Sequence, residues 1–118
     1  MADGIILYTN PQSRGRVARW MLEETGITYQ TEVLDFGTSM KSRDYLAINP
    51  MGKVPALRHG DRVVTECAAI CAYLADAFPQ SGLRPALENL ADYYRWLFFA
   101  AGPLEAAITD ARVLGVVP

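Results

Sequence analysis

The stretch Asn49-Pro-Met-Gly-Lys-Val-Pro-Ala-Leu57, followed by Val64-Thr-Glu-Cys-Ala-Ala-Ile-Cys-Ala-Tyr-Leu74, decides the fold. Two short apolar runs flank His59-Gly60-Asp61, which is typical of a hairpin turn. A helix is expected to begin at Glu66 and to keep an apolar face. The bond before Pro55 can be cis at modest cost, and a cis bond would turn the Val54 backbone away from the sheet. Unpaired backbone groups beside this helix start predict a peptide-binding corner.

Strand and helix patterns alternate upstream of this stretch. Gln12 or Ser13 can cap a first helix, and Gly26 can stop it. The strands on either side of that helix should be parallel, because a helix joins them. The expected elements are a strand at 4–9, a helix to about Thr25, a strand at 28–34, a short helix near 42–46, the hairpin, and a helix at 66–78.

A helical segment follows a linker that contains two prolines and a glycine. Apolar residues at helical spacing predict a long helix over 86–112, which Gly102-Pro103 interrupts and kinks. The aromatic patch at 93–99 is more than one helix can bury. We therefore expect the patch to be covered by further helices, by a second copy of the chain, or by both.

The composition excludes several classes of protein. A chain of 118 residues is one domain, or one domain with a partial second. Eleven basic and thirteen acidic residues give a net charge of −2. A protein that binds nucleic acid usually has an excess of basic residues, so this class is not expected. Charged residues break every apolar run short of a membrane span, and the first residues lack the features of a signal peptide. We therefore expect no membrane partner and a cytoplasmic location.

The histidine and the two cysteines give no metal or redox motif. His59, the one histidine, has no potential ligands near it in sequence, so no metal site is expected and the side chain is interpreted as an exposed turn residue. Cys67 and Cys71 stand four residues apart on one helix face. This is not Cys-x-x-Cys spacing, and the side chains are expected to run parallel rather than toward each other.

Several motifs in the expected order resemble one family. Asn-Pro-x-Gly-Lys-Val-Pro-Ala-Leu, then Thr-Glu-Cys-Ala-Ala-Ile-x-x-Tyr-Leu-Ala-Asp, resembles the glutathione-binding half of a cytosolic-type glutathione S-transferase, which usually has Ser in place of Cys67. Leu7-Tyr-Thr-Asn-Pro-Gln-Ser-Arg14 and Trp20-Met-Leu-Glu-Glu-Thr-Gly26 resemble its first strand and first helix. The resemblance covers about the first 80 residues. It implies an α/β thioredoxin-like domain (βαβαββα) at 1–79, a linker at 80–86 and a truncated all-α part at 87–118.

Glutathione is a tripeptide with one thiol, and the resemblance implies residues for each part of it. Glu66 would bind the γ-glutamyl ammonium, and the Cys67 backbone N–H would bind the γ-glutamyl carboxylate. Val54 would pair with the cysteinyl backbone as an added strand, held open by Pro55. The glycyl carboxylate would be reached by two lysines, Lys41 and Lys53.

Activation of the glutathione thiol is the remaining chemical need. Ser13 is the first candidate, because its hydroxyl can donate to the sulfur and favour the thiolate. Tyr8, near the end of the first strand, is the second candidate and Asn10 the third. Ser13 can instead simply cap the first helix, and Tyr8 can instead be a core aromatic.

The resemblance implies a glutathione transferase that conjugates the glutathione thiolate to a small hydrophobic electrophile. Glutathione would be the co-substrate, no metal is expected, and a homodimer is the expected assembly. Two alternatives stay open: a non-catalytic glutathione-binding or scaffold module, and a glutathione-dependent thiol reductase that uses Cys67 in a mixed disulfide. A third is an incomplete fold that needs a partner chain.

Overall fold

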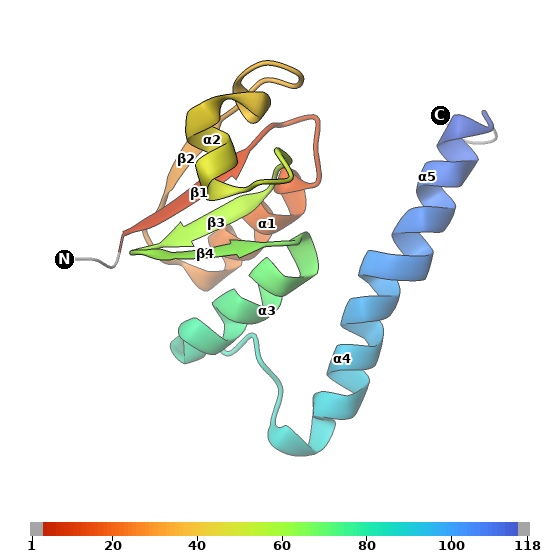
Figure 1. Cartoon of the computed structure of the whole chain (residues 1–118). Helices are drawn as coiled ribbons and strands as arrows, with labels where there is room; N and C mark the ends of the chain where they lie inside the picture. The colour runs from red at the N-terminus through yellow and green to blue at the C-terminus, as the bar shows by residue number, and fades with distance from the viewer. Residues whose placement is uncertain (1–3, 116–118) are drawn as a thin grey trace. The chain divides into compact units, whose positions relative to one another are not determined.

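A computed structural model describes residues 4–115, which fall into two compact units divided between Arg84 and Pro85. The first unit is a four-stranded sheet with helices on both faces (Figure 1). The strand order is β2-β1-β3-β4, in which only the β1–β2 pair is parallel. The elements are β1 (Ile5–Thr9), α1 (Gly15–Thr25), β2 (Gln30–Val33), η1 (Ser39–Lys41), α2 (Arg43–Ile48), β3 (Ala56–His59), β4 (Arg62–Thr65), α3 (Cys67–Ala77) and η2 (Pro79–Ser81). This confirms the predicted thioredoxin-like α/β order.

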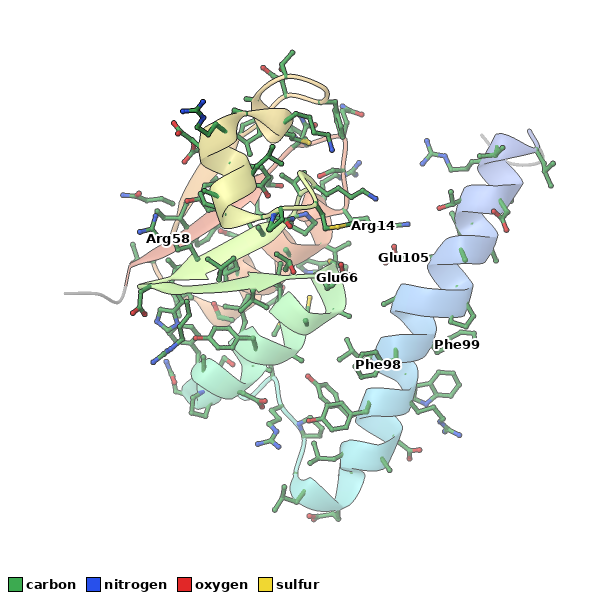
Figure 2. The ribbon with its side chains drawn as sticks, in the orientation of Figure 1. Arg14, Arg58, Glu66, Phe98, Phe99 and Glu105 are labelled. Atoms are coloured by element: carbon green, nitrogen blue, oxygen red, sulfur yellow. The ribbon has the colours of Figure 1, made fainter. Side chains whose placement is uncertain are left out.

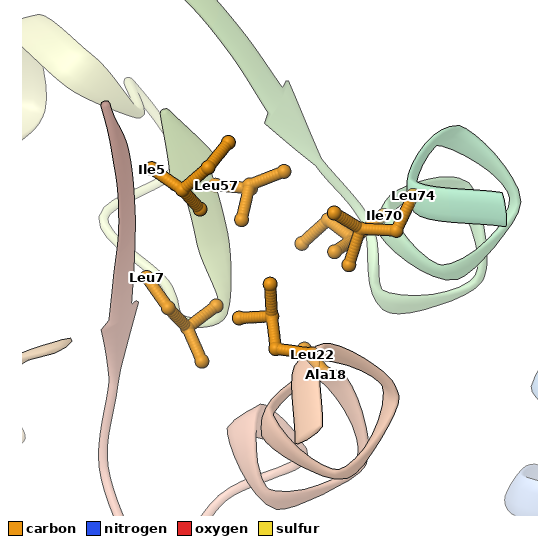
Figure 3. Close-up of a cluster of buried hydrophobic side chains, with 7 residues drawn as sticks. All are labelled: Ile5, Leu7, Ala18, Leu22, Leu57, Ile70 and Leu74. Carbon is orange, nitrogen blue, oxygen red and sulfur yellow. The ribbon is translucent and has the colours of Figure 1, made fainter. Parts of the chain in front are cut away.

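The main core lies between the sheet and the pair α1 and α3. Apolar side chains four residues apart on each helix face the sheet, and Leu7 pairs with Leu57 in the β1–β3 register beneath them. Full burial of one such leucine contributes about 1.5–3 kcal/mol. Figure 3 shows the cluster, which consists of Ile5, Leu7, Ala18, Leu22, Leu57, Ile70 and Leu74.

The other sheet face is covered by α2 and the loop before it. Ser42 caps α2 by accepting a hydrogen bond from the Tyr45 N–H at 3.2 Å. The Tyr45 ring packs at 5.5 Å from the Tyr8 ring, centroid to centroid, in a second cluster that also holds Met40 and Ala56. Burial raises the pKa of Tyr45.

Local signals set most element ends. Gly26 ends α1 in the left-handed region at φ 73°, as the sequence predicts. Gly60 turns the hairpin at φ 64°. The second strand is shorter than the expected 28–34, because only Gln30–Val33 pair with β1.

The second unit is helical from Leu87 to Val113. It comprises η3 (Leu87–Asn89), α4 (Leu90–Phe99), a π-helical turn η4 (Ala100–Leu104) and α5 (Glu105–Val113). The predicted interruption at Gly102-Pro103 is confirmed, because Pro103 lies inside the π turn, where proline's missing N–H and its ring disturb regular α-helical bonding. No helix within residues 4–115 is long and apolar enough to cross a membrane.

Candidate functional site

The sheet register brings the candidate residues to one end of the first unit. Tyr8 pairs with Ala56, and Ala56 pairs with Thr65, so these three residues form a row across β1, β3 and β4. The segment after β1, the segment before β3 and the segment after β4 all leave the sheet beyond this row (Figure 1). Segments that hold Ser13, Val54 and Glu66 therefore meet at the same edge.

Ser13 lies in the turn between β1 and α1, and its hydroxyl has two partners. The Oγ atom donates to the Asn10 carbonyl at 2.7 Å and accepts from the Gly15 N–H at 3.0 Å. The hydroxyl thus holds the turn before α1, but the expected capping by Gln12 or Ser13 was wrong, because the N-cap residue is Arg14 and no side chain caps the helix. To activate a thiol, the single proton of Ser13 must turn from the Asn10 carbonyl to the sulfur, while the oxygen keeps its bond from Gly15.

Close packing fixes this turn against the sheet. A Cβ atom on Gly15 would lie 1.8 Å from the Thr9 Oγ1 atom, so only glycine lets the first turn of α1 approach the end of β1 this closely. The Asn10 side chain braces the same turn by donating to the Leu34 carbonyl at 2.8 Å and accepting from the Gln12 N–H at 2.8 Å. Ser13 is therefore held at the sheet edge by rigid neighbours.

The other two candidates for thiol activation are engaged elsewhere. Tyr8 is 3% exposed and belongs to the cluster beneath α2, which is the core interpretation of this side chain. Both groups of the Asn10 amide already have hydrogen-bond partners, in Leu34 and Gln12. Of the three candidates, Ser13 is the one whose hydroxyl lies in the turn between β1 and α1. Its role in activating the thiol remains a prediction.

The predicted cis bond is present between Val54 and Pro55. The β1–β3 register begins at Ala56, so Val54 lies beyond the paired residues. The loop before Val54 is fixed by two hydrogen bonds. The Lys53 carbonyl accepts them from the Tyr45 hydroxyl at 2.6 Å and from the Asn49 amide at 2.8 Å. The Val54 corner is thus a supported turn beside the sheet.

The two candidate lysines differ in their surroundings. The Lys41 ammonium donates to the Gly52 carbonyl at 2.9 Å and to the Met51 carbonyl at 3.3 Å. It thereby joins the η1 segment to the loop before β3, and one of its three N–H groups remains for a further acceptor. The Lys53 side chain is exposed. Both cations border the Val54 corner.

Glu66 connects β4 to α3 in an unusual backbone conformation. Its φ of 74° is the one positive value at a non-glycine residue within 4–115, and its side chain is exposed. Its carbonyl accepts the first helical bond of α3, from the Ile70 N–H at 2.9 Å. The helix then begins at Cys67, whose N–H lies in the first turn and so cannot bond a carbonyl of the same helix.

The starts of α1 and α3 meet at this edge. The Cys67 thiol donates to the Arg14 carbonyl across 3.7 Å, and Figure 2 shows Arg14 and Glu66 at the same end of the sheet. Each helix start carries partial positive charge, which favours an anion. At α1 the first N–H groups already have partners, because Gly15 bonds the Ser13 hydroxyl and Arg16 bonds the Ser13 carbonyl. The arrangement suits a ligand with carboxylates and a thiolate.

The expectation for the histidine was wrong. His59 is half-buried rather than exposed, because its Nδ1 atom lies 2.6 Å from the Tyr73 hydroxyl and its ring stacks on Phe78. Both contacts depend on how α3 packs and rotates, which residue spacing alone does not give.

No other feature of the described residues competes for the assignment. Within 4–115 there is no group of three or more His, Cys, Asp or Glu side chains that could hold a metal ion. A hollow of about 560 Å³ lies at the opposite end of the sheet and contains none of the predicted site residues. It is lined by Gly4, Ile5, Ile6, Thr28, Tyr29, Gln30, Arg58, Gly60 and Asp61.

Comparison with known proteins defines the class. Residues 14–77 match the family model of the glutathione S-transferase N-terminal domain. Glutathione S-transferase GST-4.5 of Xanthomonas campestris is 35% identical over 100 residues, which are 83% of this chain and 48% of that protein. Glutathione S-transferase 3 of Zea mays is 38% identical over 96 residues, covering 77% of this chain and 43% of the maize protein. The chain belongs to the glutathione S-transferase family.

Solved structures agree with this assignment. A glutathione S-transferase-I structure bound with lactoylglutathione gives a TM-score of 0.79 at 34% identity, over 90% of this chain and 52% of that one. A glutathione transferase homologue from Sulfitobacter, with bound glutathione, gives 0.76 at 34% identity, over 84% and 49%. The chain thus spans about half the length of these relatives.

Proposed function

We propose that the chain binds glutathione at the edge where α1 and α3 begin, and that Ser13 activates its thiol for transfer to a small hydrophobic electrophile. The observation that carries the proposal is the contact between Cys67 and Arg14, which joins the starts of α1 and α3 at the end of the sheet where Val54 precedes β3. Relatives of the same family, two of them with glutathione-type ligands in their structures, support it.

The ligand would lie along the edge with one contact for each of its parts. The γ-glutamyl group reaches the Glu66 carboxylate and the N–H of Cys67, the cysteinyl backbone pairs with Val54, and the glycyl carboxylate faces the lysines. Backbone pairing supplies orientation, and the carboxylate contacts are charge-assisted. These contacts leave the thiol directed toward the turn that holds Ser13.

The chemistry then needs only a favoured thiolate. The Ser13 hydroxyl turns its proton from the Asn10 carbonyl to the sulfur and donates a hydrogen bond to the anion. The Gly15 N–H bond to the same oxygen polarises the hydroxyl and strengthens that donation. The glutathione thiol releases its proton to solvent, and the sulfur attacks the electrophilic carbon. The carbon–sulfur bond forms, and the leaving group departs as an anion with the electron pair of the bond that breaks.

The test compares glutathione binding with turnover. Ser13→Ala should lower kcat/KM for 1-chloro-2,4-dinitrobenzene by about 10- to 100-fold, the worth of one hydrogen bond to a charged group. Calorimetry should find the glutathione affinity changed by less than about threefold, because Ser13 touches the sulfur rather than the carboxylates. Ser81→Ala, a matched change in η2, should alter neither quantity.

Each alternative function has its own outcome. Glutathione binding by the wild-type chain with no turnover at any electrophile would favour the non-catalytic module. A glutathione adduct on Cys67 after treatment with glutathione disulfide would favour the reductase. A folded wild-type chain that binds no glutathione would contradict the proposal.

A further inference from the structure

Cys67 and Cys71 form a pair of thiols that the proposed transfer does not use. They stand one turn apart on α3, both half-buried and both reduced. The Cys67 side chain one turn away lowers the pKa of Cys71, while burial raises it. Cys71 is therefore assigned as the sulfur that ionises, and Cys67 as the neighbouring thiol.

The position of the pair lets the two sulfurs join. Helix positions four apart hold their Cβ atoms roughly 5–6 Å apart, and a disulfide needs roughly 3.5–4.5 Å. Cys67 must therefore move by about 1–2 Å. It is the first residue of α3, where the N–H groups have no helical partner, so the movement disturbs few helical bonds. The bond from Ile70 to the Glu66 carbonyl is the nearest of those few.

We propose that Cys67 and Cys71 are a redox-sensitive dithiol, which a hydroperoxide converts into an intrahelical disulfide that weakens glutathione binding. The effect on binding rests on the proposed function, because Glu66 and the Cys67 N–H are its γ-glutamyl contacts. Closing the disulfide takes the Cys67 sulfur away from the Arg14 carbonyl. It also displaces the backbone that carries Glu66.

The oxidation proceeds in two balanced steps. The Cys71 thiolate attacks the hydroperoxide, a sulfur–oxygen bond forms, the oxygen–oxygen bond breaks, and the alkoxide or hydroxide leaves with a proton. The Cys67 sulfur then attacks the resulting sulfenic acid, a sulfur–sulfur bond forms, and the leaving hydroxide takes the Cys67 proton as water. Two equivalents of glutathione can reverse the change by thiol–disulfide exchange, which yields glutathione disulfide.

The experiment treats the full, reduced chain with hydrogen peroxide and follows two readouts. Mass spectrometry of the peptide that holds both cysteines should show the loss of two hydrogens and no alkylation of either sulfur. Calorimetry should show glutathione affinity lower by about tenfold or more, within the usual range of coupling between sites. Dithiothreitol should restore both.

Cys71→Ser is the matched control. Reduced, it should bind glutathione like the wild-type chain, and it should lack the dithiothreitol-reversible loss of affinity. Separate sulfinic acids on the two cysteines, or a disulfide between chains, would overturn the dithiol. A disulfide with unchanged affinity would overturn the link to binding. A reduced chain that binds no glutathione would overturn the proposed function and that link, while the peptide mass still decides the dithiol.

Discussion

At the scale of single residues, Glu66 combines a strained backbone with an exposed carboxylate. A φ of 74° and a ψ of 121° suit glycine far better than glutamate. The conformation turns the chain from β4 into α3 and leaves the carboxylate and the next N–H at the sheet edge. Glycine would be the better residue for folding alone, so the glutamate side chain is the feature to test.

Glu66→Gly should therefore separate stability from binding. Relief of strain is worth about 1–3 kcal/mol, and the added freedom of the unfolded chain costs about 1 kcal/mol. Urea denaturation should give a free energy of unfolding about 1 kcal/mol above that of Glu66→Ala, which keeps the strain. Calorimetry should find glutathione binding weakened in both variants. A Glu66→Gly chain less stable than Glu66→Ala would show that the backbone is not strained.

At the scale of elements, α2 supports the site through one side chain. The Tyr45 hydroxyl donates to the Lys53 carbonyl at 2.6 Å and so holds the loop that leads to Val54. Burial raises the pKa of Tyr45, the Asn49 side chain lowers it, and Tyr8 raises it. The neutral phenol is thus favoured in the folded chain.

Tyr45→Phe should reveal the raised pKa of Tyr45 through the pH dependence of the free energy of unfolding. At pH 7 the variant should lose about 1 kcal/mol, the net worth of one hydrogen bond. Above the unfolded pKa of 10.0, the unfolded wild-type chain releases the proton that the folded chain retains, so wild-type stability falls as pH rises. The difference between the two chains should shrink from pH 7 toward pH 11 in urea denaturation. A difference that stays constant would contradict the raised pKa.

Elements with local signals could be predicted from the sequence, and contacts between elements could not. Gly26, the hairpin glycine and Pro103 act on their own neighbours, so they mark the ends and interruptions correctly. The limits of β2 depend on pairing with β1. The hydrogen bond between Cys67 and Arg14 joins residues 53 apart in sequence, and no sequence pattern within either helix predicts it.

At the scale of the whole molecule, the second unit leaves an aromatic surface uncovered. Trp96, Phe98 and Phe99 of α4 are 56%, 59% and 45% exposed. Figure 2 shows Phe98 and Phe99 projecting from different sides of that helix. Trp96 contacts Phe99, and Tyr94 contacts Phe98. Exposed aromatic side chains are typical of protein interfaces. We propose that a second copy of the chain covers these side chains.

Sedimentation velocity should then find a dimer. Phe98→Glu places a charge in the contact and should shift the chain toward the monomer, with the dimer Kd raised about tenfold or more. Val17→Glu makes the same kind of change on α1 and should leave the dimer intact, since Val17 is 44% exposed but lies in the first unit. A wild-type chain that is monomeric at all concentrations would rule out the second copy as the partner.

The row formed by Tyr8, Ala56 and Thr65 has a consequence for how such a chain can change over time. The segments that hold Ser13, Val54 and Glu66 lie beyond that row, and the hairpin turn lies at the far end of the same strands. Substitutions that alter recognition and substitutions that tune the turn thus fall on separate residues. Mutations that change ligand recognition and mutations that change the hairpin turn can therefore accumulate independently. The sheet can then acquire a new ligand specificity while it keeps its fold.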